Sequence, residues 1–154
     1  MRGPVLGYLY ALGCPHSQAE EIVQESFLRL HRGWREGLQV ADVRAWIYRV
    51  ARNLWIDARR EQQRYSAPTE PERSDRSYDD PAPGPEQQLL HLERIRRIEK
   101  VVSRLPKMER ECIRLKAQGL RYHEIASILE ISMTAAVDSV RRAVRRLERL
   151  KEKL

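Results

Sequence analysis

The stretch from residue 120 to residue 147 constrains the fold most, because it holds two apolar stripes at helical spacing with a short break between them. Ile125, Ala126 and Leu129 form the first stripe. Ser132 follows the break and is a good N-cap, because its hydroxyl can accept a hydrogen bond from an amide of the next turn. The second stripe predicts a helix from residue 133 that buries Met133, Ala136, Val137, Val140, Val144 and Leu147.

The opposite side of this second predicted helix is polar and mostly basic. Its residues are Thr134, Asp138, Arg141, Arg142, Arg145 and Arg149. Two short helices joined by a tight turn, the second of them basic, are typical of a helix-turn-helix, whose second helix lies in the DNA major groove. The alternative is a helical hairpin whose charged face is only solvated, as charge runs usually are.

The rest of the chain predicts an all-α fold made of two small helical domains. Only 6% of its 154 residues are aromatic, and no alternating apolar and polar runs point to a sheet. Five of the eight prolines fall between residues 62 and 87, among acids, serines and arginines that cannot bury a core. We therefore expect helical domains at residues 1–61 and 88–154, joined by a flexible, Pro-rich acidic linker at residues 62–87.

The formal charge of +7 indicates a polyanionic partner, most simply nucleic acid, because the positive charge is clustered in arginine runs. A basic surface without a ligand is the alternative. Cys14 and Cys112 are far apart in the sequence and form no CxxC motif, which favours buried free thiols in a reducing compartment. No signal peptide is present, and no apolar run approaches the ~20 residues of a membrane span, so the sequence predicts a cytoplasmic protein.

No pattern of catalytic or cofactor-binding residues is present. The chain has no Walker loop, no GxGxxG and no GxSxG motif. Cys14 and His16 are too close in sequence and lack further partners for a metal site. We therefore expect no enzyme activity, no cofactor and no metal.

The predicted second helix, at residues 18–34, carries an unusual acidic stripe. Ser17 is expected to cap this helix in a capping box with Glu20. Its inward face is expected to contain Ile22, Val23, Phe27, Leu30 and Trp34. A neighbouring stripe at helical spacing is either a solvated face with acids near the helix N-terminus or a docking surface for a protein. That stripe consists of Glu21, Gln24, Glu25 and Leu28.

The predicted third helix, at residues 43–60, interleaves aromatic residues with arginines. Its expected core face is Val43, Ile47, Val50, Ala51, Leu54 and Ala58. Trp46 and Asn53 share one flank with arginines, and Tyr48 and Trp55 share the other. Such a pattern is typical of single-stranded DNA binding, where each stacked base contributes ~1–3 kcal/mol. The alternative is that the two tryptophans widen the core face, which we favour for Trp55 and leave open for Trp46.

Two further helices precede the helix-turn-helix. The first, at residues 86–105, is expected to bury Leu89, Leu92, Ile95, Ile98, Val102 and Leu105. Pro106 opens the next helix, where proline is tolerated in the first turn. Gly119 is suited to the C′ position that ends it.

Four segments of the chain resemble the extracytoplasmic-function (ECF) group of the sigma-70 family. AEEIVQESFLRL at residues 19–30 resembles the acidic helix of region two, and RAWIYRVARNLWIDARR at residues 44–60 resembles its promoter-melting helix. RLPKMERECIRLKAQGLRYHEIASILEIS at residues 104–132 resembles the first half of region four. AAVDSVRRAVRRL at residues 135–147 resembles its recognition helix. The resemblance covers both predicted domains.

The resemblance implies a subunit without catalytic activity that binds core RNA polymerase and directs promoter recognition and transcription initiation. The implied partners are core polymerase, through its β′ clamp helices and β flap, promoter DNA and an anti-sigma protein. Residues 35–42 would hold a flipped-out base. The residues that would dock on the clamp helices are Glu21, Gln24, Glu25 and Leu28. Those that would lie near the opened minus-ten element are Trp46, Arg49, Arg52, Asn53 and Arg60. Those that would face minus-thirty-five bases are Thr134, Ala135, Asp138, Ser139 and Arg142, and those that would bind phosphates there are Arg141, Arg145 and Arg146.

Three features depart from the family pattern. The first helix begins late, which implies either a start further upstream or a weakly packed helix. Glu130 stands where the family often has glycine in the turn, and a left-handed backbone there would be strained. Asp138 puts an acid on the reading face, where it could accept from a cytosine amino group or repel wrong sites.

The rival hypothesis is a free-standing helix-turn-helix regulator. Such proteins read paired half-sites as dimers, with the remaining helices forming the dimer or sensing a ligand. This chain has no obvious dimer helix, and the aromatic residues of its third helix would be unexplained.

Overall fold

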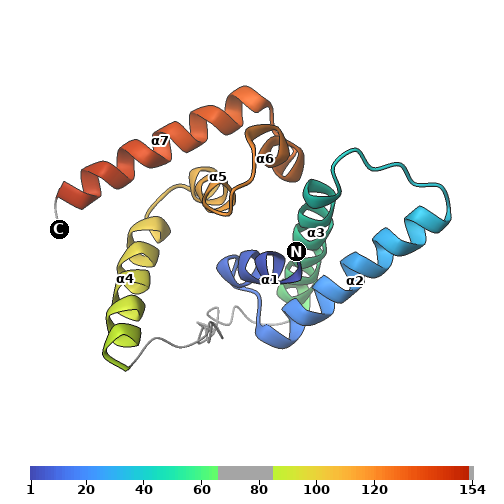
Figure 1. Ribbon diagram of the computed structural model, residues 1–154, viewed down its shortest axis with the longest axis horizontal. Coiled ribbons are helices and arrows are strands. Elements are labelled where there is room, and N and C mark those ends of the chain that lie inside the picture. The colour runs from blue at the N-terminus through green and yellow to red at the C-terminus, as the bar shows by residue number, and fades with distance from the viewer. Residues whose placement is uncertain (66–84, 153–154) are drawn as a thin grey trace.

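The computed structural model describes residues 1–65 and 85–152, and within these ranges the fold is all-α (Figure 1). The fold class predicted from the sequence is therefore confirmed. None of the described helices combines the length and hydrophobicity needed to cross a bilayer. The helices are α1 (Arg2–Ala11), α2 (His16–Arg35), α3 (Val43–Tyr65), α4 (Pro85–Ser103), α5 (Lys107–Ala117), α6 (Tyr122–Leu129) and α7 (Met133–Glu152).

The predicted linker at residues 62–87 is too long at both ends. Helix α3 continues to Tyr65, because no glycine or proline interrupts the sequence before that point. Helix α4 already begins at Pro85, which the first turn of a helix tolerates. The rest of the predicted linker, residues 66–84, lies outside the described residues.

Helices α1, α2 and α3 pack on one another and form the first half of the molecule. The short α1 is well packed, since Val5, Tyr8 and Leu9 are fully buried. The loop between α1 and α2 turns at Gly13, whose φ of 90° suits glycine. Helix α2 begins at His16 with Pro15 at the N-cap, so the predicted cap at Ser17 is wrong.

Two residues predicted from helical spacing lie elsewhere in this half. Trp34 was expected to face inward but is 52% exposed, because α2 and α3 diverge towards the loop that joins them (Figure 1). Tyr48 was placed on a flank of α3 and is buried. Trp55 is buried as well, which confirms the interpretation that it widens the core. The flank is covered because α3 has neighbours on two sides, α1 and α2 on one and α6 on the other.

Helices α5, α6 and α7 pack on one another in the second half, and α6 and α7 form the predicted helix-turn-helix. The Ser132 hydroxyl accepts a hydrogen bond from the Ala135 amide at 3.0 Å, which confirms the predicted cap. Gly119 follows α5 with a φ of 83°, as expected of a C′ glycine.

The buried stripe of α7 differs from the predicted one. Met133 and Val144 were expected inside but are exposed. Ala136 and Val140 are buried as predicted, and Ser139 and Ala143, which were not in the predicted stripe, are buried beside them. Small side chains along this stripe let α7 approach its neighbours closely.

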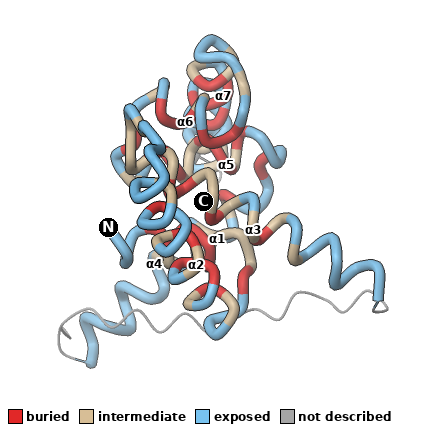
Figure 2. The backbone as a smooth tube through the Cα atoms, turned by 90° about the vertical axis from the view of Figure 1, so that its right-hand side faces the viewer, coloured by how far each residue is buried: buried red, intermediate tan, exposed pale blue. Residues whose placement is uncertain are grey.

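Helix α4 lies mostly outside the core. Leu89, Leu92 and Ile98 are exposed, contrary to the prediction, whereas Val102 and Leu105 at the end of the segment are buried. The reason is that α4 contacts the other described helices only near its C-terminal end, where it packs on α7 and Glu99 accepts from Arg114 of α5. In Figure 2, accordingly, most of α4 is coloured as exposed.

The two halves also pack against each other, α6 on α3 and α5 on α1. Buried side chains of both halves form one continuous cluster, which extends from Val5 in α1 to Val140 in α7. The division of the chain into domains at residues 1–61 and 88–154 remains a prediction.

Replacing Glu130 by glycine is expected to stabilise the protein by about 1 kcal/mol. Glu130 ends α6 with φ 55° and ψ 45°, a left-handed conformation that is unfavourable for a residue with a Cβ atom. Thermal unfolding followed by circular dichroism measures the change. The matched control is Ser127→Gly, inside the same helix, which should destabilise. A lower melting temperature for Glu130→Gly would show that its side chain has a stabilising role.

Candidate nucleic-acid and polymerase interfaces

The outer side of α7 carries an exposed row of arginines. Arg141, Arg142 and Arg145 are all exposed, as are Thr134 and Asp138 in the first half of the helix. Ala135 is half-buried, and Arg142 Nε donates to the backbone oxygen of Asp138 at 3.4 Å. The helix therefore presents side chains suited to phosphates and base edges along one side.

Two residues predicted for this surface are engaged elsewhere. Ser139 is only 3% exposed, because it lies on the side of α7 that packs on α5, so its predicted role in facing bases is wrong in this structure. Its hydroxyl hydrogen-bonds Cys112, which opposes the increase that burial causes in the pKa of that thiol. Arg146 forms an ion pair with buried Glu109 at 3.1 Å, although half of the Arg146 side chain stays exposed.

The flank of α3 predicted to read melted DNA faces the second half of the molecule. Trp46 and Arg49 are half-buried, and they line a groove of about 310 Å³ between α3, the preceding loop and α6. His123 and Ser127 of α6 line the opposite side of this groove. Asn53 and Arg60, further along α3, are exposed. The groove brings together an aromatic ring and a guanidinium group, which suit an unstacked base and its phosphate.

Arg52, to which the resemblance assigns a place near the opened minus-ten element, binds α5 in this structure. Its Nη2 donates to a carboxylate oxygen of Glu111 in α5 at 2.9 Å, and the two side chains are 14% and 6% exposed. Fifty-nine positions separate the two residues. Helical spacing along α3 therefore could not have shown the contact.

The acidic stripe of α2 is open to solvent. Glu21 and Gln24 are exposed, and Leu28 is 44% exposed. Glu25 accepts from Arg29 Nε at 3.0 Å within the same helix. Helix α2 packs on α1 and α3 but not on the second half, so nothing described covers the stripe. An exposed leucine among acids is a suitable anchor for a partner helix with basic side chains.

Three side chains of types that can bind a metal, those of Asp42, His123 and Glu124, lie close together between the two halves. Their ligand atoms lie within 4.8 Å of one another. Both carboxylates already accept backbone hydrogen bonds at 3.0 Å at the start of a helix, Asp42 from Ala45 and Glu124 from Arg121. The sequence did not indicate this group because its members come from distant segments. Because both carboxylates already accept hydrogen bonds from backbone amides, we interpret this group of three side chains as structural.

Both cysteines are fully buried and free of disulfide bonds. Burial raises the pKa of the Cys14 thiol to about 12. Since the thiolate is the reactive form, both side chains should be inert near neutral pH, in keeping with the prediction that they fill the core.

Comparisons with known proteins point to one family. Residues 1–65 match sigma-70 region 2. The chain is 31% identical over 132 residues to the probable RNA polymerase sigma factor RfaY of Xanthomonas campestris pv. campestris, with 81% of this chain and 32% of the relative covered. It is 28% identical over 141 residues to the ECF RNA polymerase sigma factor SigE of Mycolicibacterium smegmatis, with 90% of this chain and 53% of the relative covered.

Two solved structures share the fold. The sigma factor RpoE of Bartonella quintana, in complex with the anti-sigma factor NepR, aligns with a TM-score of 0.70 at 18% identity, covering 98% of this chain and 91% of that one. CnrH, in complex with the cytosolic domain of CnrY, aligns with a TM-score of 0.62 at 20% identity, covering 97% and 81%.

The chain spans about a third of RfaY and about half of SigE. The match to region 2 falls on α1, α2 and α3, whereas the matches to both relatives cover most of the chain. The helix-turn-helix of α6 and α7 agrees with the resemblance of residues 104–147 to region four. The chain therefore belongs to the ECF group of the sigma-70 family.

Proposed function

We propose that this protein binds core RNA polymerase and directs it to promoters, and that it has no catalytic activity of its own. The observation that carries the proposal is the exposure of two unlike surfaces on different halves of the molecule. One is the acidic stripe of α2 with Leu28 at its C-terminal end, and the other is the arginine face of α7. A protein partner and a nucleic acid could therefore be bound at the same time.

Promoter reading is divided between the two halves in this proposal. Helix α7 lies in the major groove of the minus-thirty-five element, where Arg142 and Asp138 read base edges while Arg141 and Arg145 bind phosphates. The groove beside Trp46 and the exposed residues Asn53 and Arg60 receive the melted minus-ten strand, and the loop at residues 35–42 holds a flipped-out base. The half-buried Trp46 ring supports this assignment, because one side of it lines the groove.

The polymerase contacts follow the same division. The α2 stripe docks on the β′ clamp helices, and the second half contacts the β flap. Transcription takes place in the cytoplasm of a bacterium, so we place the protein there. An anti-sigma protein is a further proposed partner, since RpoE of Bartonella quintana binds one and shares this fold.

Reconstituted transcription tests the proposal. The purified chain is mixed with core RNA polymerase from the same organism and fragmented genomic DNA, and the transcripts are sequenced. We expect new transcripts that start at a fixed distance from a shared pair of sequence elements. If the chain fails to bind core polymerase but binds a palindromic duplex tightly, it is a free-standing regulator instead.

Replacing Arg142 by alanine is expected to weaken binding to the minus-thirty-five duplex by ~1–3 kcal/mol and to relax the preference for one base pair. Arg142 is exposed near the middle of the arginine face, within reach of base edges. The measurement is holoenzyme affinity for duplexes that carry each base pair at every minus-thirty-five position. The matched control is Arg149→Ala near the end of α7. A uniform loss across all sequences would assign Arg142 to a phosphate.

A further inference from the structure

Arg146 lies at the border between the arginine face of α7 and the side of that helix that packs on α5. It follows Arg142 by four residues and the buried Ser139 by seven, and both spacings keep side chains on neighbouring parts of a helix surface. About half of the Arg146 side chain is exposed. Arg146 can therefore contact α5 and a molecule bound to the arginine face at the same time.

The contact of Arg146 on α5 is Glu109, an acid in the first turn of that helix. Glu109 is only 5% exposed, and its buried Oε2 atom lies 3.1 Å from Arg146 Nε. The two atoms are close enough for an ion pair but are not aligned as a hydrogen bond, and no other described residue donates to that oxygen. Burying a carboxylate oxygen without a hydrogen bond costs free energy, so packing alone does not explain an acid at this position.

The ion pair is not needed to join α5 to α7. The two helices already pack on each other through buried side chains, and the Ser139 hydroxyl hydrogen-bonds Cys112 between them. An ion pair with a half-exposed partner adds little to stability, because water screens it and ordering a long side chain costs entropy. A role for Glu109 in stability alone is therefore the weaker explanation.

The contact restrains the guanidinium group of Arg146 without using its donors. A guanidinium group has five N–H donors, and no described residue accepts a hydrogen bond from those of Arg146. The other arginines of this face, Arg141, Arg142 and Arg145, have no partner on another described helix. A side chain that is already restrained loses less conformational entropy when it binds a ligand. Arg146 is therefore the best prepared of the four to bind an anion at a fixed position.

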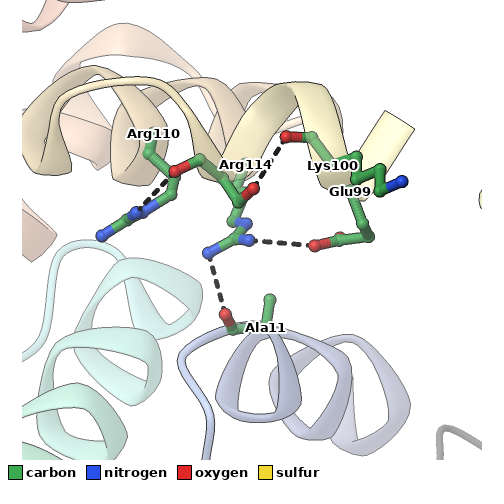
Figure 3. A network of polar contacts seen from close by, with 6 residues as sticks. Ala11, Glu99, Lys100, Arg110 and Arg114 are labelled. Carbon is green, nitrogen blue, oxygen red and sulfur yellow. Dashed lines mark hydrogen bonds and ion pairs between the residues drawn. The ribbon is translucent and has the colours of Figure 1, made fainter. Parts of the chain in front are cut away.

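Helix α5 can restrain Arg146 because the helix is itself bound to α4. Arg110, the residue after Glu109, donates to the backbone oxygen of Ser103 at 3.4 Å. One turn later, Arg114 donates to the carboxylate of Glu99 at 3.1 Å (Figure 3). Both contacts lie within the second half of the molecule, so they do not depend on how the two halves pack.

We propose that Glu109 is a positioning residue, which holds Arg146 for one phosphate of the minus-thirty-five duplex. The two terminal nitrogens of the guanidinium group bind two phosphate oxygens as a fork, while Nε stays beside Glu109. The phosphate lies at the border of the groove whose bases Arg142 reads, so this contact fixes the position of α7 in the groove. The proposal rests on the proposed function, because the phosphate belongs to promoter DNA.

Glu109 has two effects on phosphate binding, and they have opposite signs. Its negative charge weakens the attraction of this region for a phosphate, whereas its hold on Arg146 lowers the entropy cost of ordering the guanidinium group. In the proposal the second effect is larger, because Glu109 lies on the far side of the guanidinium group from the phosphate. The sign of the change in DNA affinity on removing the charge therefore decides between a positioning residue and a merely repulsive one.

The hold on Arg146 is tested on the full chain without polymerase or DNA. Nuclear magnetic resonance order parameters of the arginine Nε–H groups measure their mobility on the picosecond-to-nanosecond timescale. The signal of Arg146 is the one that disappears in Arg146→Ala. We expect its order parameter to lie above that of the exposed Arg141 and to fall to the Arg141 value in Glu109→Gln. This substitution keeps the size of the side chain and removes its charge.

Binding of the holoenzyme to the minus-thirty-five duplex tests the phosphate contact. Arg146→Ala should weaken binding about tenfold for all sequences alike and reduce the salt dependence by about one phosphate contact. Glu109→Gln should weaken binding about threefold, and it should have no further effect in the Arg146→Ala protein, because it acts through that side chain. The matched control is Glu148→Gln, an exposed acid on α7 itself, which should not weaken binding.

The outcomes separate the hold on Arg146 from the proposed function. Circular dichroism checks the folding of each variant, and Glu109→Met, which is apolar and of similar size, replaces Glu109→Gln if that variant is unfolded. An Arg146 side chain as mobile as Arg141 overturns the hold. Unchanged or tighter duplex binding in Glu109→Gln, or a loss that persists in Arg146→Ala, overturns the positioning role. The expected order parameters in a protein that supports no transcription with core polymerase keep the hold and overturn the proposed function.

Discussion

Replacing Leu28 by aspartate is expected to reduce the affinity for core RNA polymerase by about 2–4 kcal/mol, which is ~30-fold or more. Leu28 is a large apolar side chain at the end of an exposed acidic stripe, with Gln24 and Glu25 one turn before it. In a protein interface such a residue fills a pocket while the surrounding charges select the partner. Aspartate would remove the apolar contact and bury a carboxylate without a partner.

Fluorescence anisotropy of labelled protein titrated with core polymerase measures this loss. The matched control is Leu90→Asp on α4, which is also an exposed leucine and undergoes the same change of charge. Both variants should keep their melting temperatures, because neither side chain is part of the core. An equal loss of affinity in the two variants would indicate a general effect of charge rather than docking through the α2 stripe.

Replacing Trp46 and Asn53 together by alanine is expected to weaken promoter opening by about 2–4 kcal/mol and to leave duplex anchoring unchanged. Loss of one stacked base costs ~1–3 kcal/mol, and loss of a hydrogen bond to a base edge costs ~0.5–1.5 kcal/mol. The two residues are seven positions apart, ~10 Å along the helix, so their contributions should add.

Fluorescence of 2-aminopurine in the minus-ten element measures opening, and binding to a minus-thirty-five duplex measures anchoring. Trp34→Ala is the matched control, because Trp34 is an exposed tryptophan outside the groove. Thermal unfolding of the variants shows whether losing the half-buried Trp46 ring affects stability. A decrease in duplex anchoring as large as the decrease in opening would contradict the proposed division between the two halves.

The sequence predicted what local rules determine. The helix-turn-helix, the Ser132 cap and the C′ position of Gly119 all depend on residues a few positions apart. Predicted burial was less accurate wherever a helix has neighbours on two sides or on none. Tyr48 is buried because its ring packs on Tyr8 of α1 and its hydroxyl donates to Gln118 at the end of α5, and Leu89 is exposed because no described helix covers that part of α4.

The candidate site shows the same limit. Helical spacing placed Leu28 and Arg142 on surfaces that are exposed in the structure. It could not place Arg52, whose partner Glu111 lies in the other half, or show that Ser139 faces α5 rather than solvent. Such contacts between distant segments depend on how the two halves pack, and a single sequence does not contain that information in local form.

Arg52 lies between the two halves of the molecule, and this limits how the protein can change. Asn53 is the next residue, about 100° around the helix, and is exposed, so it can vary without altering that contact. Arg52 cannot, because lysine would keep the charge but lose the planar fork that binds the carboxylate of Glu111. A substitution at Arg52 should therefore require a matching one at Glu111, fifty-nine positions away, because either change alone leaves a buried charge without its partner.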